Sequence, residues 1–302
     1  MHIFSLRGPT IGKPAILNLL VAKPTYLAIL AHPDDEFGLA GYLRKRVLHD
    51  AQVHLVYATR GERGTGAEDL TTHPSLASLR EREARTAARV LGIDSVRFLD
   101  YVDSGPPTTA LSNASRSLCR RSEGELVGLV TELFDRLHPN VVLTYEPRGW
   151  YGHRDHIRLS QVVTAAFEAC ARKGSAWRPQ RLLYSVVPMS SFRRLRDATL
   201  IAGLSVDEYE LFDFDMKDEA AESVDLSCDV ELHWRTKLRA LRCHRSQYGS
   251  RHALHRLPEE ELYAFLRHEY FIRASCPIQP VLAPLPRRRE AAPSLKIRSC
   301  DS

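Results

Sequence analysis

The hydrophobic and polar positions along the chain predict strands and helices in alternation. Short apolar runs of strand length occur at 26–31, 53–58, 96–99, 141–145 and 181–187. Apolar residues recur at helical spacing over 37–49, 78–91, 125–137, 155–170 and 234–243. Gly92 directly follows the second helical segment, where a glycine commonly ends a helix. This repetition predicts an α/β fold with a doubly wound, mostly parallel sheet.

The remaining segments carry weaker patterns. Residues 1–23 form a lead-in, and 190–232 contain clustered arginines followed by acids. We expect 190–232 to form surface loops and a small appended element. Residues 277–302 combine five prolines with a triple arginine and have no apolar period, so we expect a disordered tail. The predicted organisation is one domain over 1–276 and a tail over 277–302.

The first candidate site follows the apolar run that begins at Tyr26. His32 ends the run, and Pro33, which has no backbone donor, stops the strand. Three carboxylates follow in a row: Asp34, Asp35 and Glu36. Ligands of open α/β sheets bind at the carboxyl ends of strands. Clustered carboxylates repel one another, so this stretch favours a nearby cation, and histidine with aspartate suits zinc or a similar divalent metal.

A second candidate stretch, His153-Arg-Asp-His156, follows the run at 141–145 and opens a helix. His153 and His156 share a face of the first turn. His156 can complete a His/Asp/His set with His32 and Asp35, which would leave one position for water, as in catalytic zinc sites. Taken alone, a histidine at a helix start is more often a cap, and an Asp-Asp-Glu run is more often a solvated helix start.

Composition narrows the function. The net charge of the 302 residues is +5, and the tail supplies five basic and two acidic residues. The remaining body is nearly balanced, which argues against nucleic acid as a partner. Six cysteines form no CxxC pair, which favours reduced thiols in the cytoplasm. No apolar run reaches about 18 residues, so stable membrane insertion is not expected.

Several other enzyme motifs can be excluded by spacing. His153-Arg-Asp155 matches the kinase HRD triplet, but Ser160 stands where the kinase needs asparagine, and no DFG occurs. Gly61, Gly64 and Gly66 are spaced GxxGxG rather than GxGxxG. Neither GxSxG nor HExxH occurs.

The segments AHPDDE at 31–36 and GHRDH at 152–156 resemble motifs of the PIG-L/LmbE-type N-deacetylase family. The resemblance spans about residues 26–250 and includes weaker motifs: TRGERGTG at 59–66, Arg80-x-x-Glu83, Asp103-Ser-Gly105 and Lys237…His244-x-Ser-Gln247. It implies a Rossmann-like sheet and a metal-dependent hydrolase. The implied reaction removes the N-acetyl or another N-acyl group from an N-acetylglucosamine-type sugar.

The resemblance also implies roles for individual residues. The implied metal ligands, for Zn²⁺ or alternatively Fe²⁺, are His32, Asp35 and His156. Asp34 would be the general base that takes a proton from a metal-bound water. His153 and Tyr151 would lie near the oxyanion, Asp155 would orient His153, and Arg80 and Asp103 would contact the sugar. This chain departs from the family pattern at Arg154 and Trp150, which would alter the lip and entrance of the pocket.

The expected partner is a small-molecule amino-sugar conjugate, and a homo-oligomer is compatible with the sequence. Two other functions remain open at this stage. One is a metal amidase that acts on a non-sugar amide such as a thiol conjugate. The other is a non-catalytic sugar-binding protein that kept the fold. The intact ligand set argues against the second.

Overall fold

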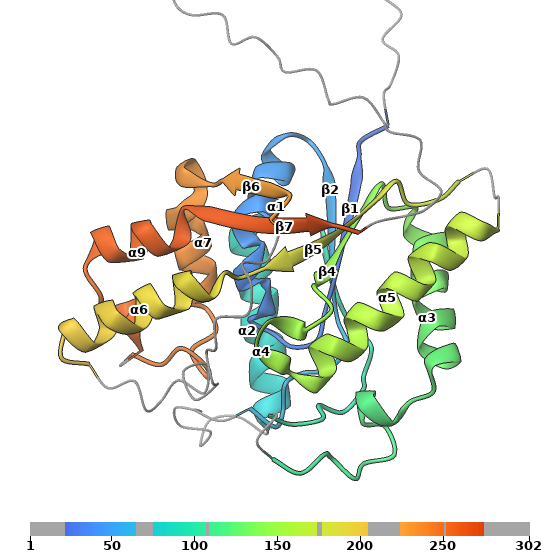
Figure 1. The fold of residues 1–302 in the computed structure, drawn as a ribbon, viewed down its shortest axis with the longest axis horizontal. Coiled ribbons are helices and arrows are strands. Elements are labelled where there is room, and N and C mark those ends of the chain that lie inside the picture. Colours follow the sequence, from blue (N-terminus) through green and yellow to red (C-terminus); the bar gives the residue numbers. More distant parts are fainter. Residues whose placement is uncertain are drawn as a thin grey trace, which may run out of the picture.

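The computed structural model describes residues 22–64, 75–106, 109–173, 177–204, 224–250 and 252–274. Seven strands form one sheet (Figure 1): β1 Thr25–Leu30, β2 Gln52–Tyr57, β3 Ser95–Phe98, β4 Val141–Tyr145, β5 Arg181–Val186, β6 Leu226–Asp229 and β7 His268–Arg273. Their order is β3-β2-β1-β4-β5-β7-β6. Neighbours among the first five strands pair in parallel, whereas β7 is antiparallel to β5 and β6. The predicted mostly parallel α/β fold is confirmed.

Helices cover both faces of the sheet. They are α1 Ala40–Leu48, α2 Leu76–Leu91, α3 Glu123–Leu137, α4 Gly149–Gly152, α5 Arg154–Arg172, α6 Met189–Ile201, α7 Trp234–Leu241, α8 Ala253–Arg256 and α9 Glu259–Leu266. Helices α1, α2 and α7 pack together on one side, while α3 and α5 pack together on the other (Figure 1). Within the described ranges, no helix is both long and apolar enough to cross a membrane.

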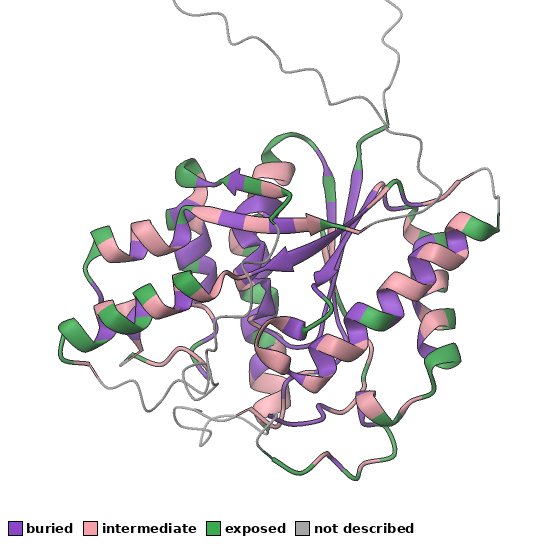
Figure 2. Cartoon of the chain, viewed as in Figure 1, coloured by how far each residue is buried: buried purple, intermediate pink, exposed green. Residues whose placement is uncertain are grey.

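Strand β1 is central, and all six of its residues are buried (Figure 2). A parallel strand covered on both faces needs such a continuous apolar run. β1 pairs with β2 on one side and with β4 on the other. The direction in which successive strands are added reverses between β1 and β4, and this is where open α/β sheets form their binding crevice.

Surface loops and a small appended element were expected over 190–232, and two parts of that range form regular elements. Helix α6 begins at Met189, and it buries Phe192, Leu195 and Thr199 along one face. Arg194 and Arg196 are exposed on the other side of the helix. These charged residues make the helical spacing of the buried positions hard to recognise in the sequence. Near the end of the range, β6 joins the sheet as an edge strand next to β7.

Strand β7 was not predicted, and its buried charge explains why. Glu269 lies inside the strand, yet it is buried because its carboxylate accepts hydrogen bonds from the backbone of Gly41 (2.8 Å) and Tyr42 (2.6 Å). These amides lie in the first turn of α1, where backbone donors lack partners within the helix. Lys237 of α7 completes the arrangement at 2.8 Å from the same carboxylate.

Several predictions fall on residues outside the described ranges. They include most of the lead-in, Thr65 and Gly66 of the TRGERGTG segment, the acidic run over 207–222, and the tail. The domain boundary at residue 276 therefore stays a prediction.

Candidate metal centre

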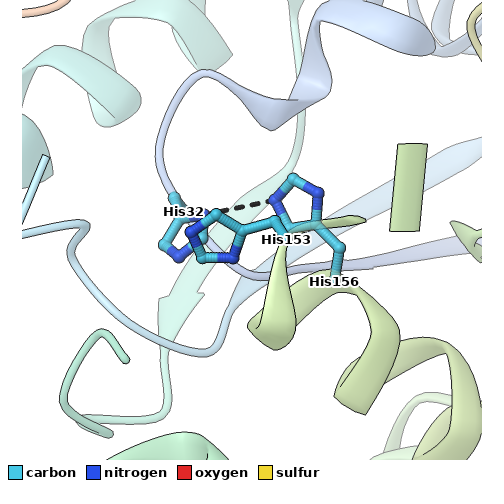
Figure 3. Close-up of side chains that lie close together, drawn as sticks. All are labelled: His32, His153 and His156. Atoms are coloured by element: carbon cyan, nitrogen blue, oxygen red, sulfur yellow. Dashed lines mark hydrogen bonds between the residues drawn. The ribbon is translucent and has the colours of Figure 1, made fainter. Parts of the chain in front are cut away.

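The two candidate stretches meet at the carboxyl ends of adjacent strands. His32 and Asp35 follow β1, and the histidines of the second stretch follow β4 at the start of α5. His153 caps α5, and its ring nitrogen Nδ1 accepts the backbone N–H of Asp155 at 3.2 Å. His156 lies in the first turn. Figure 3 shows the imidazoles of His32, His153 and His156 gathered in one place.

Three donor groups converge most closely. Nδ1 of His32 lies 3.3 Å from Nε2 of His156, and it lies 3.3 Å from Oδ2 of Asp35. Nε2 of His156 lies 3.1 Å from Oδ1 of Asp35. Donor atoms that bind zinc tetrahedrally at its usual bond lengths lie about 3.3 Å apart. The spacing fits one small divalent ion.

Each of the three donor side chains also contacts a protein group outside the set. Nε2 of His32 lies 3.2 Å from Oδ2 of Asp155, and Nδ1 of His156 lies 3.3 Å from the carbonyl oxygen of Gly149. Oδ2 of Asp35 accepts the hydroxyl of Tyr145 at 2.6 Å. Such outer contacts fix the orientation of metal ligands. The donor set therefore fits a metal, because these contacts fix the three side chains while Nδ1 of His32, Nε2 of His156 and the Asp35 carboxylate converge.

Two other groupings of buried side chains are close enough to bind an ion: His32 with His153 and His156, and His32 with Asp103 and Asp155. In the second, the carboxylates face Nε2 of His32 at 3.5 and 3.2 Å, which is explained by an imidazole N–H that donates to them. In the first, His153 already accepts a backbone hydrogen bond as a helix cap. The set of His32, Asp35 and His156 is the stronger candidate.

The buried charges of this cluster shift one another's pKa values. Burial opposes a charged His32, but Asp103 and Asp35 raise its pKa well above the ordinary value. Burial likewise opposes ionised Asp35, yet His156 and His32 hold its pKa well below the usual range. Burial and the neighbouring histidines lower the pKa of His153 to about 3. His153 is therefore neutral at pH 7.

Asp34 sits beside the donor set with an unusual backbone. Its φ is 92°, in the left-handed region, which aspartate tolerates better than most residues. Oδ1 of Asp34 lies 3.3 Å from the Arg80 guanidinium. Burial raises the pKa of Asp34 to about 7, although Arg80 opposes the shift. A carboxyl group with this pKa can exchange a proton near neutral pH.

Glu36, the third acid of the first stretch, pairs with residues outside the donor set. It is completely buried, and Oε1 lies 2.5 Å from Nε2 of His244. Oε2 accepts the hydroxyl of Tyr57 at 2.6 Å. The partner His244 is more than 200 positions away in the sequence, so local pattern could not reveal this pair.

Arg80 and Asp103 are deeply buried and already bonded within the protein, so their expected role as sugar contacts stays a prediction. Each is only 3% exposed. Arg80 donates to the carbonyl oxygens of Pro33, at 2.9 Å, and Gly61. A side chain at Gly61 or Gly64 would collide with the guanidinium, so the glycines of the TRGERGTG segment let the backbone wrap around Arg80.

Asp103 is engaged in the same way by neighbouring backbone. Its carboxylate accepts the N–H of Gly105 at 2.7 Å and that of Arg63 at 3.2 Å. Oδ1 also lies 3.5 Å from Nε2 of His32. Asp103 thus shapes the loop and helps to hold a metal-ligand candidate.

Asp155 was expected to orient His153, a role that stays a prediction, and its side chain has other partners in the structure. Its carboxylate contacts His32 and accepts the backbone N–H of Ser104 at 2.9 Å. The thiol of Cys119 donates to its other oxygen at 3.2 Å. Only the backbone N–H of Asp155 reaches His153. Ser104, Cys119 and Tyr145 were missed as site residues because they come from separate strands and loops.

Two aromatic residues that precede the second stretch, Trp150 and Tyr151, border the site. The ring of Tyr151 lies edge-on to those of His153 and His156, with centroids 5.9 and 5.4 Å apart. Trp150 has a φ of 62°, and its indole N–H donates to the carbonyl oxygen of Ser185 at 3.0 Å. Its ring lies edge-on to His156, 5.4 Å between centroids. Trp150 therefore forms a fixed wall beside this ligand candidate.

The weaker family motifs pair with one another across the fold. Ser246 donates its backbone N–H (2.9 Å) and hydroxyl (2.5 Å) to the carboxylate of Glu83. His244 pairs with Glu36, and Lys237 pairs with Glu269. These contacts join α7 and the loop after it to α2, to the loop after β1 and to β7.

Together these observations describe a candidate mononuclear metal centre in the crevice of a doubly wound sheet, with a carboxyl and a neutral imidazole beside it. A family model described as PIG-L, GlcNAc-PI de-N-acetylase, matches residues 27–167. A 1D-myo-inositol 2-acetamido-2-deoxy-alpha-D-glucopyranoside deacetylase from Mycolicibacterium vanbaalenii is 31% identical, over 73% of this chain and 80% of that protein. An enzyme of the same name from Actinosynnema mirum is 30% identical, over 86% of this chain and 95% of that protein. The chain belongs to the PIG-L family.

Solved structures show the same fold at lower identity. A conserved protein from Thermus thermophilus gives a TM-score of 0.56 at 19% identity, covering 88% of this chain and 99% of that one. The N,N'-diacetylchitobiose deacetylase from Pyrococcus horikoshii gives 0.53 at 19%, covering 83% of each chain. A 4-carboxy-2-hydroxymuconate hydratase from Pseudomonas putida gives 0.55 at 16%, covering 86% and 100%. The fold therefore does not by itself determine the reaction.

Proposed function

We propose that this protein is a metal-dependent hydrolase that removes the N-acetyl group from the N-acetylglucosamine unit of a small amino-sugar conjugate. The observation that carries the proposal is the convergence of His32, Asp35 and His156, with 3.1–3.3 Å between donor atoms, directly beside Asp34. Relatives named as deacetylases of an inositol-linked 2-acetamido-2-deoxyglucoside support the same substrate class.

Nδ1 of His32, the carboxylate of Asp35 and Nε2 of His156 would hold the ion, which we propose to be Zn²⁺ with Fe²⁺ as the alternative. When bound, the ion supplies Lewis-acid activation of a water and of the acetyl carbonyl group. The nitrogen and oxygen donors suit either ion.

Asp34 is the proposed general base. Its carboxyl has a pKa raised to about 7 by burial, and the positive charge of a bound ion would lower that value. Asp34 can therefore accept a proton from the attacking water near neutral pH. Asp34 also returns this proton to the departing amine, because the pKa of His153, about 3, keeps that ring a neutral imidazole, which is too weak an acid to protonate the amine.

His153 and Tyr151 are the proposed donors to the oxyanion. Because Nδ1 of His153 accepts the N–H of Asp155, the neutral ring carries its proton on Nε2. This N–H can donate to the charge that develops on the acetyl oxygen, and the Tyr151 hydroxyl can add a second hydrogen bond. Asp155 and Asp103 orient a proposed metal ligand, because their carboxylates face Nε2 of His32.

We place the enzyme in a reducing, cytoplasmic compartment. Four cysteines lie within the described ranges, Cys119, Cys170, Cys228 and Cys243, and all of them are free thiols. A secreted protein more often carries its cysteines as disulfides.

The test is an amine-release assay with purified protein and a panel of N-acetylated compounds. The panel contains N-acetylglucosaminyl-inositol, N-acetylglucosamine, N,N'-diacetylchitobiose and, as a non-sugar control, N-acetylcysteine. We expect release from the sugars, loss of release after chelation, and recovery when Zn²⁺ or Fe²⁺ is added back. Release from the non-sugar amide alone would identify an amidase. Sugar binding by metal-loaded protein without any release would identify a non-catalytic binding protein.

A further inference from the structure

We propose that Glu36, held in place by His244 and Tyr57, is a positioning residue for Asp34. It fixes the left-handed backbone of Asp34 through the amide of that residue, and so sets the direction in which the catalytic carboxyl points. This inference rests on the proposed function, because it assigns a role relative to the proposed base.

The contacts of Glu36 divide between its two oxygens. Oε2 accepts the backbone N–H of Asp34 at 3.0 Å and the hydroxyl of Tyr57 at 2.6 Å. Oε1 faces Nε2 of His244 at 2.5 Å. Both members of the ion pair are completely buried, and the pair joins the site loop to the loop after α7. One carboxylate therefore fixes the Asp34 amide from a position that is itself held on two sides.

The backbone of Asp34 needs such support. Its φ of 92° and ψ of −17° are sparsely populated by residues other than glycine. This conformation turns the chain between two adjacent carboxylates with different partners. Asp35 faces His32 and His156, while Asp34 faces Arg80. If the amide of Asp34 lost its acceptor, the backbone could relax toward commoner angles and the carboxyl would leave this position.

A second set of contacts holds the same residue from its other side. Arg80 donates to the carbonyl oxygen of Pro33 at 2.9 Å and lies 3.3 Å from the carboxylate of Asp34. Arg80 thus contacts the peptide before Asp34 and its side chain, whereas Glu36 contacts its amide. The two residues leave Asp34 little freedom to rotate.

A purely structural role for the pair is the competing explanation, and a double-mutant cycle separates the two. The first variant is Glu36→Met, which is similar in size but cannot accept the Asp34 amide. We expect kcat to fall about 10- to 100-fold with metal content near one equivalent. In an Asp34→Asn background the same change should lower kcat by less than about 3-fold, because the base that it positions is already gone.

Two further variants keep the test decisive if Glu36→Met folds poorly, since it leaves His244 buried without its partner. Glu36→Met combined with His244→Leu replaces the whole ion pair by apolar side chains, which often preserves stability. We expect this double variant to keep its melting temperature and metal but not its kcat. Glu36→Gln retains an oxygen that can accept the amide, so it should recover most of the kcat lost in Glu36→Met.

The matched control is Glu269→Gln, which alters another buried carboxylate that holds backbone amides and pairs with a basic side chain. Its effect on kcat should multiply with that of Asp34→Asn, as for independent sites. Full multiplication for Glu36→Met as well, or wild-type kcat in the paired apolar variant, would overturn the positioning role. A wild-type protein that releases no amine from any sugar would instead overturn the proposed function, and this inference with it.

Discussion

The hydroxyl of Tyr145 at the end of β4 donates to Oδ2 of Asp35 at 2.6 Å, and it accepts the backbone N–H of Ala31 at 2.6 Å. The same oxygen of Asp35 accepts the backbone N–H of His32 at 2.7 Å. With Oδ2 held by two donors, Oδ1 is left to face Nε2 of His156. Tyr145 therefore locks the orientation of one carboxylate, and its neighbour in the sequence, Asp34, is held by different partners.

This difference predicts separable phenotypes for the two adjacent aspartates. Asp35→Ala removes one of three ligands and should weaken metal affinity and abolish activity together. Asp34→Asn should keep the metal and lower kcat about 10²- to 10⁴-fold, because it removes only a proton acceptor of the same size. Metal analysis and steady-state kinetics on the two variants check the assignment.

The pH dependence of kcat sharpens this comparison. Burial raises the pKa of Asp34 to about 7, and a base works only when it is deprotonated, so wild-type activity should fall as the pH drops below the pKa of the metal-loaded enzyme. This acidic limb should disappear in Asp34→Asn. Loss of metal in Asp34→Asn, with retention in Asp35→Ala, would reverse the assigned roles.

The metal itself should be required at about one equivalent per chain, the content of a single three-ligand site. His32→Ala and His156→Ala should each lose metal and activity in parallel, as measured by elemental analysis and amine release. His233→Ala, a change in the short helix Glu231–His233, is the control and should retain both. Undiminished turnover after exhaustive chelation would rule out the metal-dependent mechanism.

The close approach of Gly38 to the Trp150 wall predicts a costly substitution. A methyl group at Gly38 would lie 2.5 Å from Oγ of Ser185 and 2.9 Å from the Trp150 ring. Gly38→Ala should therefore destabilise the protein by about 1–3 kcal/mol through overpacking. Gly128→Ala in α3, where nothing lies within 4 Å, should stabilise it by about 0.5–1 kcal/mol. Urea unfolding measures both, and equal effects would contradict the packing argument.

His252 predicts a pH-dependent component of stability. Burial lowers its pKa to about 3 from an ordinary value of 6.5, so between these values the unfolded chain binds the proton more readily than the folded one. The stability from neutral His252 is complete above pH 6.5 and is lost as the pH falls toward 3. Lowering the pH from 7 to 5 should cost about 2 kcal/mol through this group.

The matched variant is His252→Asn. The ring nitrogen of His252 accepts the N–H of Leu254 at 3.1 Å at the start of α8, and asparagine can accept the same hydrogen bond without titrating. Urea unfolding at pH 7 and pH 5 should show a smaller loss for the variant by about 2 kcal/mol. Equal losses in the two proteins would show that His252 does not contribute.

The chain beyond Cys276 should be dispensable for folding and turnover, because all seven strands of the described sheet end before it. Arg273 ends β7 with its N–H bonded to Asp225, and the N–H of Ala274 donates to Leu182. Truncation after Cys276 should leave the melting temperature and kcat nearly unchanged. A fall of several degrees would show that 277–302 packs against the domain.

The parallel half of the fold could be predicted from sequence because its signals are local. β4 lies at 141–145 as predicted, and Gly92 ends α2 in the left-handed conformation expected of a glycine cap. The clustering of His32, Asp35 and His156 also followed from motif positions at the ends of two strands. Such strand ends meet at one sheet edge whenever the strands are parallel.

The remainder depended on contacts between residues far apart in the sequence. Glu269 is a charged residue inside a strand, and only Lys237 and the amides of α1 make its burial acceptable. Glu36 follows Asp34 and Asp35 in the sequence, but its carboxylate forms an ion pair with His244. Arg80 has the chemistry of a sugar contact, yet backbone oxygens surround it. In each case the role of the residue depends on a partner that is distant in the sequence, so the local sequence pattern does not reveal it.

β7 is the last strand of the described residues to be synthesised, yet it lies between β5 and β6 rather than at the margin of the sheet. A nascent chain therefore carries both candidate metal-binding stretches well before it can complete the sheet. Until β7 pairs, β5 exposes an unpaired edge, which is a template for association with other chains. Cotranslational folding can bring the donor residues together early, but protection from aggregation must wait for β7.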